Sequence, residues 1–261
     1  HLMTPCEAIL LGLLQGLTEF LPVSSSGHLE LGKHFLHITG SENLTFSLIV
    51  HAATVLSTIV VFRRDLLHLI VQVSKFQNNP ESRFFLKLLL SAIPIALVGL
   101  FFRDKVESLY TGNLILVGSC LLTTALLLTF AYLKKGTPAK EISWAHSLII
   151  GISQALAVLP GLSRSGTTIA TGLILGNDRK ETARFSFLMV LIPILGANFL
   201  DALHGSAGSD TQLLPLIIGF ATAFVSGLLA CKWMIRLVSS GKLIYFALYC
   251  LFIGLIAIFA A

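Results

Sequence analysis

The chain has 261 residues, of which 55% are hydrophobic and only 12% are charged. Soluble domains carry about 25% charged residues, so this composition excludes an ordinary soluble protein and indicates that lipid surrounds most of the surface. The net charge is +5, but no basic cluster with interleaved aromatic residues is present, which argues against a nucleic-acid partner.

The first predicted element, residues 4–37, is apolar but is interrupted near Pro22, where Gly and Ser gather. Its pattern is helix, polar break, helix. Irregular backbone at membrane depth is tolerated only where protein or a water-filled cavity shelters it. We therefore predict a re-entrant helical hairpin with a polar tip.

Glu19 stands out in this hairpin, because an ionisable residue at membrane depth costs about 2.5–3.5 kcal/mol on insertion scales and is rarely idle. The structural alternative is an ion pair with Arg164 or Lys33. Gln15 lies one helical turn earlier and shares the face of Glu19. Together they could hold a divalent cation, although one carboxylate and one amide form a small ligand set.

A run of three serines, Ser24, Ser25 and Ser26, precedes Gly27 in the same break. One serine can cap a helix, but three exceed that need. We interpret them as donors to phosphate oxygens or as the source of a nucleophile. His28 can face Ser24 and Ser25 on a helix and act as base, acid or phosphate donor; a buried structural histidine is the alternative.

Three apolar runs follow, each near the roughly 20 residues that cross a bilayer: 44–62, 84–102 and 114–133. They are continuous rather than alternating, which predicts helices and not strands. His51 lies inside the first run without a polar partner nearby in the sequence, and we predict a packing role for it.

A second broken segment, residues 144–176, is interrupted at Pro160 and again predicts a re-entrant hairpin. Arg164 falls at an expected helix start, where backbone N–H groups and the helix dipole favour an anion that an Arg can grip with two hydrogen bonds. The alternative is a counter-ion for Glu19. The predicted phosphate-binding residues of both hairpins are Ser24, Ser26, Gly27, Ser163, Ser165, Gly166 and Thr168. Three more predicted spans follow at 182–202, 213–235 and 243–261.

The chain repeats itself with an offset of 139 residues, which superposes polar positions without a gap. Examples are Gln15 on Gln154, Ser24 on Ser163, Ser26 on Ser165, and Gly27 on Gly166. We predict two homologous halves, 1–135 and 140–261, each with one hairpin and three spans. An odd number of spans gives an inverted-topology repeat, which places a site at the repeat interface near the bilayer midplane. The predicted fold is thus an all-α polytopic membrane protein with six transmembrane helices plus two re-entrant hairpins in one membrane domain.

The distribution of Lys and Arg orients this arrangement. With the N-terminus outside, the outer loops contain only Arg103 and Lys105. The segments that then face the cytoplasm contain fourteen: Arg63, Arg64, Lys75, Arg83, Lys87, Lys134, Lys135, Lys140, Arg179, Lys180, Arg184, Lys232, Arg236 and Lys242. The positive-inside rule therefore predicts both termini outside.

The polar set of Glu, His, Arg, hydroxyls and glycines, without a Walker A, H-E-x-x-H or G-x-S-x-G motif, suits phosphoryl transfer by positioning and charge stabilisation. A site at membrane depth implies a substrate with a lipid tail. We predict that Arg164, together with Ser163 and Ser165, binds the pyrophosphate and so forms a phosphate clamp. Glu19, with Gln15, would hold a metal ion or activate water. Ser25, activated by His28, is the predicted nucleophile, with direct attack by water as the alternative.

The two breaks resemble those of the bacterial undecaprenyl-pyrophosphate phosphatase family, also called the bacitracin-resistance protein family. Its first motif is Glu or Gln, three residues, Glu, a Ser-rich turn and His, matched here by Gln15, Glu19, Ser24–Ser26 and His28. Its second, P-G-x-S-R-S-x-x-T, is matched over Pro160–Thr168. Departures are Gln15 where several members have Glu, which puts a charged metal ligand there in doubt, and Ser26 where Thr is common.

The resemblance implies hydrolysis of undecaprenyl pyrophosphate to the monophosphate and phosphate in the bacterial plasma membrane, serving cell-wall synthesis and bacitracin resistance. It also implies a site open to the outer face and dependence on Mg²⁺ or Ca²⁺. A rival reading is transport, because inverted repeats with broken helices are typical of secondary transporters. Such a protein would flip polyprenyl phosphate, alone or as a second activity. The sequence does not indicate an oligomeric state.

Overall fold

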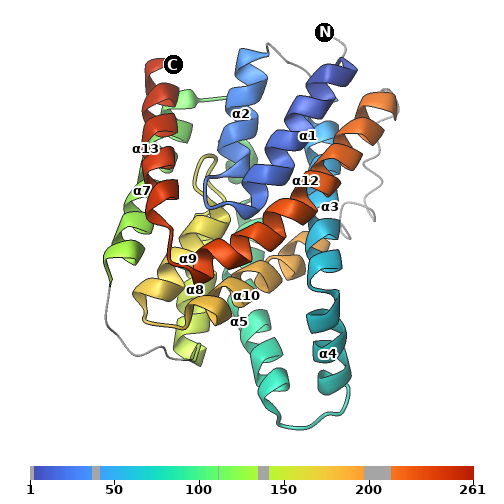
Figure 1. Cartoon of the computed structure of the whole chain (residues 1–261), viewed down its shortest axis with the longest axis vertical. Coiled ribbons are helices and arrows are strands. Elements are labelled where there is room, and N and C mark those ends of the chain that lie inside the picture. Colours follow the sequence, from blue (N-terminus) through green and yellow to red (C-terminus); the bar gives the residue numbers. More distant parts are fainter. Residues whose placement is uncertain (1–2, 37–41, 111, 135–140, 197–212) are drawn as a thin grey trace.

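The computed structural model describes residues 3–36, 42–110, 112–134, 141–196 and 213–261, and all secondary-structure elements within these ranges are helices (Figure 1). Three of them are long and apolar enough to span a membrane: α5 (Pro80–Phe101), α7 (Leu114–Leu133) and α12 (Leu213–Ser239). A fourth candidate span joins α3 (Glu42–Val61) to α4 (Arg63–Val73) through a bend of 71°. Large apolar side chains such as Leu100, Phe130 and Leu229 stay exposed on these helices, which confirms the prediction of an all-helical multi-pass membrane protein.

The last predicted spans differ from the structure in length or continuity. The C-terminal helix, α13 (Ile244–Phe259), is apolar but has 16 residues. The predicted continuous span 182–202 is wrong, because α10 (Arg179–Met189) ends before Val190 and a new helical stretch covers 191–196. Pro193 explains the interruption, since it has no N–H to donate to the carbonyl of Met189 and its ring crowds that carbonyl. Residues 197–202 of this predicted span lie outside the described residues.

Both predicted hairpins have the expected pattern of helix, break and helix. The first consists of α1 (Pro5–Phe20) and α2 (Ser25–Phe35), and the second of α8 (Trp144–Leu156) and α9 (Arg164–Ile174). A short helix, α6 (Arg103–Glu107), follows α5. Each hairpin helix begins at a side-chain cap; Thr4 and Glu7 form a reciprocal capping box at α1.

The hairpins pack across the two halves of the chain in a reciprocal way. The first helix of the first hairpin, α1, lies along α12, while the first helix of the second hairpin, α8, lies along α5. Glycines permit both approaches: a Cβ at Gly16 would lie 2.6 Å from the carbonyl oxygen of Ala223, and one at Gly151 would lie 2.4 Å from that of Ser91. The helices α7 and α13 also pack against each other.

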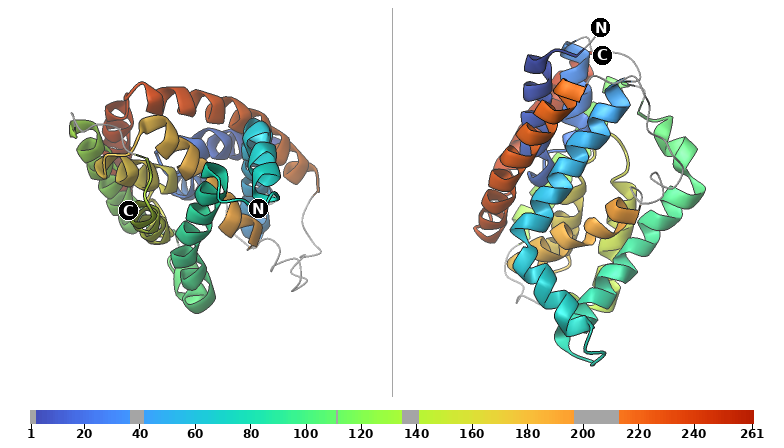
Figure 2. Two further views of the ribbon diagram at one scale, coloured as in Figure 1. Left: turned by 90° about the horizontal axis from the view of Figure 1, so that it is seen from below. Right: turned by 90° about the vertical axis from the view of Figure 1, so that its right-hand side faces the viewer.

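The start of α1 and the end of α13 lie at one end of the molecule, and the turn between α4 and α5 lies at the opposite end (Figure 1). From that turn, α5 slants away from α3 and α12, as the right-hand view of Figure 2 shows. Phe185 and Phe187 of α10 are buried in the protein interior. Phe187 contacts Phe20 and Phe62 at ring-centroid distances of 6.0 Å. The two polar breaks are thereby held between helices from both halves.

Candidate functional site

The two breaks are in contact at the centre of the molecule. A Cβ placed on Gly27 would lie 3.0 Å from Cα of Gly161, and one placed on Gly166 would lie 3.2 Å from Cβ of Pro22. The backbone N–H of Gly161 also donates to Oγ of Ser26 at 3.4 Å. Gly27 and Gly166 are 139 residues apart in the sequence, as are Pro22 and Gly161, so the two contacts are equivalent to each other under the predicted repeat.

Equivalent serines cap the helices that leave the two breaks. Oγ of Ser24 accepts from the N–H of Gly27 at 3.2 Å at the start of α2, and Oγ of Ser163 accepts from the N–H of Gly166 at 3.1 Å at the start of α9. Ser24 adopts a positive φ of 71°, which a non-glycine residue rarely does outside functional or tightly constrained turns. The predicted capping role of one serine in the triple run is thus confirmed for Ser24.

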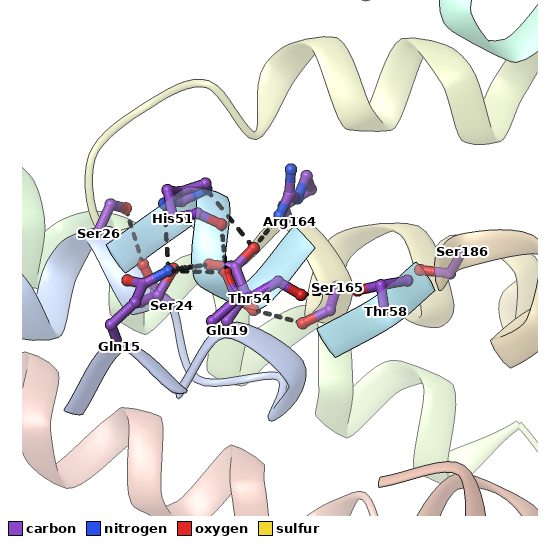
Figure 3. Close-up of polar contacts among 12 residues, drawn as sticks. Gln15, Glu19, Ser24, Ser26, His51, Thr54, Thr58, Arg164, Ser165 and Ser186 are labelled. Atoms are coloured by element: carbon purple, nitrogen blue, oxygen red, sulfur yellow. Dashed lines mark hydrogen bonds and ion pairs between the residues drawn. The ribbon is translucent and has the colours of Figure 1, made fainter. Parts of the chain in front are cut away.

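The carboxylate of Glu19 lies where these two helix starts converge (Figure 3). Its side chain is only 8% exposed and forms an ion pair with Arg164, whose Nη2 donates to Oε1. The second oxygen, Oε2, accepts from Oγ of Ser25 at 2.6 Å and from Nε2 of Gln15 at 2.9 Å. Arg164 and Ser25 are each the first residue of their helix, so the structure brings the predicted site residues of both hairpins to one carboxylate.

His51 belongs to this cluster, and the predicted packing role was wrong. Its Nδ1 lies 3.1 Å from Nε2 of Gln15, and its Nε2 lies 3.7 Å from Oε1 of Glu19. Gln15 is fully buried and also reaches Oγ1 of Thr54 at 3.4 Å. The partners of His51 are more than thirty residues away in the sequence, yet its ionisable side chain at membrane depth was a usable signal.

A cavity of about 800 Å³ opens beside this cluster, a size typical of sites for small ligands. Its polar end is formed by Glu19, the three serines of the first break, His51 and 163–165 of the second break. One wall is apolar and comes from α5, with Ala92, Ile95, Ala96, Gly99 and Leu100; the cavity extends to Arg103 and Tyr110 beyond that helix. The cavity therefore joins a polar end, with charged and hydroxyl side chains, to an apolar wall.

The structure does not bring His28 to Ser25, which corrects the predicted nucleophile–base pair. Nδ1 of His28 lies 2.8 Å from the carbonyl oxygen of Ser24, and Nε2 lies 2.8 Å from the hydroxyl of Tyr249, whose ring stacks on the imidazole. Because a carbonyl only accepts, Nδ1 carries the proton and Nε2 accepts from Tyr249. His28 is 5% exposed and stabilises the backbone of Ser24 rather than the hydroxyl of Ser25.

Three of the residues predicted to bind phosphate, Gly27, Gly166 and Thr168, contact other parts of the protein instead of the cavity. Gly27 and Gly166 provide the close contact of the breaks, while the hydroxyl of Thr168 shares a hydrogen bond of 2.6 Å with Ser186 and donates to the carbonyl of Arg164. None of the three lines the 800 Å³ cavity. They pack next to the site without lining its cavity. The other predicted phosphate-binding residues, Ser24, Ser26, Ser163 and Ser165, do line the cavity.

Glu19 and Gln15 are the predicted protein ligands of a divalent cation, Mg²⁺ or Ca²⁺. Within the described ranges, no group of three His, Cys, Asp or Glu side chains is placed to bind a cation. Oε1 of Gln15 is buried beside Glu19 and has no hydrogen-bond partner in the part of the chain that the structure describes. One carboxylate and one amide oxygen fit a Mg²⁺ ion that takes its other ligands from water and phosphate oxygens.

The fold and site together define a multi-pass membrane protein in which two helix–break–helix segments meet at a largely buried ion pair beside a cavity with an apolar wall. The chain matches the family model of the bacitracin resistance protein BacA over residues 8–256 and belongs to that family. Its similarity to curated relatives extends over nearly the full length of both chains. An undecaprenyl-diphosphatase of Bacteroides fragilis is 52% identical over 256 residues, covering 97% of this chain and 96% of the relative.

Two further relatives with the same name span different degrees of identity. The undecaprenyl-diphosphatase of Bacteroides thetaiotaomicron is 51% identical over 260 residues and covers 98% of both chains. That of Methanobrevibacter smithii is 36% identical over 268 residues, covering 96% of this chain and 95% of the relative. The predicted family is thus confirmed.

Proposed function

We propose that this protein hydrolyses undecaprenyl pyrophosphate to undecaprenyl phosphate and inorganic phosphate. The observation that carries the proposal is the convergence of Arg164 and Ser25, at two helix N-termini, on Glu19 at the polar end of an apolar cavity. Helix N-termini and an Arg fork favour phosphate. Relatives at about 50% identity over nearly the whole chain carry the name of this activity; such a name does not favour the rival reading as a flippase.

Substrate binding can rearrange the ion pair at the centre of the site. In the structure, Glu19 and Arg164 neutralise each other in a mostly buried setting. A terminal phosphate is a second anion that competes for the guanidinium, with the helix dipole of α9 adding to its attraction. Transfer of Arg164 to the phosphate frees Oε1 of Glu19, while the short hydrogen bond from Ser25 keeps Oε2 beside the nucleophile.

Catalysis then uses the Ser25–Glu19 pair, which replaces the predicted pairing of Ser25 with His28. Oγ of Ser25 forms a bond to the terminal phosphorus, and Glu19 takes the proton of the Ser25 hydroxyl. The bond from that phosphorus to the bridging oxygen breaks, and undecaprenyl phosphate leaves. Water then attacks the phosphoserine and releases inorganic phosphate. Direct attack by a water that Glu19 activates is the alternative, in which Ser25 only orients the carboxylate.

The lipid tail is assigned to the apolar wall along α5. Three of the residues that line this wall, Ala92, Ala96 and Gly99, are small, and a Cβ at Gly99 would meet no atom within 4 Å. An isoprenoid chain can therefore lie against Ala92, Ala96 and Gly99 while its pyrophosphate reaches Arg164. This placement gains favourable burial of apolar surface at the same time as charge recognition.

A divalent cation, Mg²⁺ or Ca²⁺, is part of the proposal, with Glu19 and Gln15 as its protein ligands. When bound, such an ion would offset phosphate charge. The buried Oε1 of Gln15 supports this assignment. Removal of divalent ions with a chelator should abolish phosphate release, and addition of Mg²⁺ or Ca²⁺ should restore it. Full activity after exhaustive chelation would contradict the assignment.

The orientation with both chain ends outside and a site open to the outer face is likewise proposed. The positive-charge bias supports it. In addition, the start of α1 and the end of α13 lie opposite the α4–α5 turn (Figure 1), and the cavity follows α5 away from that turn to Arg103. The inverted repeat, with halves 1–135 and 140–261, is supported by the reciprocal packing of α1 on α12 and α8 on α5.

Purified protein in detergent tests the proposed function directly. Incubation with undecaprenyl pyrophosphate should release inorganic phosphate in a continuous, enzyme-dependent reaction. A flippase without hydrolytic activity would release none. The absence of phosphate release from folded protein supplied with Mg²⁺ or Ca²⁺ would overturn the proposal.

A further inference from the structure

Gln154, in the last turn of α8, has a buried amide side chain. It is only 2% exposed, and neither Nε2 nor Oε1 has a hydrogen-bond partner among the described residues. An amide buried in this way lowers the stability of the fold. A buried polar group of this kind calls for a hydrogen-bond partner, which a bound ligand can supply.

Gln154 also lines the 800 Å³ cavity that contains the proposed phosphate clamp. Val158, Ser163 and Arg164 line the same cavity, so Gln154 and Arg164 border one shared space, with the amide of Gln154 buried at its wall. A ligand that reaches Arg164 can therefore also contact Gln154.

A comparison with the first hairpin indicates what kind of ligand group this is. Gln15, the residue 139 positions earlier, is buried in the same way, and its Nε2 donates to the carboxylate of Glu19 at 2.9 Å. The position equivalent to Glu19 in the second hairpin is Val158. The second hairpin thus keeps the amide donor but has no carboxylate at the corresponding position to accept from it.

We propose that the substrate supplies the missing anionic acceptor: Gln154 binds an oxygen of the pyrophosphate group, with Nε2 donating to a P–O⁻ oxygen. Its Oε1 can accept from a protonated phosphate oxygen, since an amide offers both a donor and an acceptor. This assignment rests on the proposed function and adds a second phosphate contact, from α8, to the Arg164 clamp on α9.

The substitution Gln154→Leu separates ligand binding from a structural role. Leu is of similar size and removes both unpaired polar atoms, so the folded protein should be as thermostable as wild type or more so. At the same time, kcat/KM for undecaprenyl pyrophosphate should fall by about 10- to 100-fold, the range expected for one hydrogen bond to a charged group. Inhibition by inorganic pyrophosphate should weaken in parallel, which a purely structural change would not cause.

Ser153→Ala is the matched control, because Ser153 is a buried neighbour on α8 whose hydroxyl donates to the carbonyl of Ile150 at 2.7 Å. This variant should retain wild-type kcat/KM and pyrophosphate inhibition. Gln154→Met provides a second apolar replacement with an unbranched side chain. If both Gln154 variants fail to fold, the amide has a structural role and the proposal is overturned.

The outcomes also separate this inference from the proposed function. If wild type and Ser153→Ala release no phosphate, the proposed function itself fails. If they release phosphate, and Gln154→Leu matches them in kcat/KM and in inhibition by pyrophosphate, only the assignment of Gln154 is overturned.

Discussion

The two hairpins share one backbone plan but carry different chemistry. Each has a helix, a break and a serine-capped second helix, and the first residue of that second helix reaches Glu19 in both cases. This residue is Ser25 in the first hairpin and Arg164 in the second, although the two positions are equivalent in the 139-residue offset. Similarly, Glu19 corresponds to Val158. Two similar hairpins thus place their second-helix starts at one carboxylate, and the differences at these two pairs of positions are the basis on which we propose acid–base chemistry for the first hairpin and an anion clamp for the second.

The largest expected loss of turnover comes from substitution of Arg164, in the second hairpin. Arg164→Ala should lower turnover by about 10³- to 10⁵-fold, because an arginine that stabilises phosphoryl-transfer charge contributes that much elsewhere. Arg164→Lys should stay severely impaired, since it keeps the charge but loses the planar fork. Phosphate release with saturating substrate measures both. Near-wild-type turnover of Arg164→Lys would show that only charge matters at this position.

The equivalent position in the first hairpin should follow. If Ser25 is the nucleophile, Ser25→Ala should reduce turnover by about 10²- to 10⁴-fold, within the range for loss of a positioned reactive group. Rapid quenching of wild type with substrate labelled in its terminal phosphate should trap labelled protein, and Ser25→Ala should trap none. A wild-type enzyme that never retains label, together with a mild effect of Ser25→Ala, would favour the water route.

A smaller effect on turnover is expected from Tyr249, which hydrogen-bonds to His28 next to the first break. Tyr249→Phe removes the hydroxyl that donates to His28 but keeps the stacked ring. Loss of one neutral hydrogen bond should cost about 1 kcal/mol of stability and reduce turnover only a few-fold. Thermal unfolding and phosphate release report the two quantities. A loss of turnover as severe as that of Ser25→Ala would place His28 in the chemistry after all.

Much of the fold was predictable because membrane helices leave strong local signals. The spans at α5, α7 and α12 have continuous apolar runs, and the breaks near Pro22 and Pro160 contain helix-disrupting and polar residues. The interruption near Val190 was missed because the apolar run of 182–202 continues across it. Pro193 was the available sign, since proline inside an apparent helix commonly breaks it.

The site was predictable where its members share one hairpin and less so where distant helices meet. The motif spacing placed Gln15 beside Glu19, the run of three serines near a helix cap and Arg164 at a helix start, and the structure brings these residues together. The pairing of His28 with Tyr249, more than two hundred residues away, depends on the packing of α13 and leaves no trace in local spacing. For the same reason, His51 could not be assigned to Glu19 from the sequence.

The central claim is that Glu19 and Arg164 act on a phosphate and are not merely a buried structural ion pair. Phosphate release by the double variant Glu19→Gln/Arg164→Ala, compared with the two single variants and with wild type, tests it most directly. If the pair only neutralises its own charges, removing both should restore the folded state and leave substantial turnover. The phosphate-site account predicts a folded double variant with turnover as low as that of Arg164→Ala or lower; substantial turnover in that variant would contradict it.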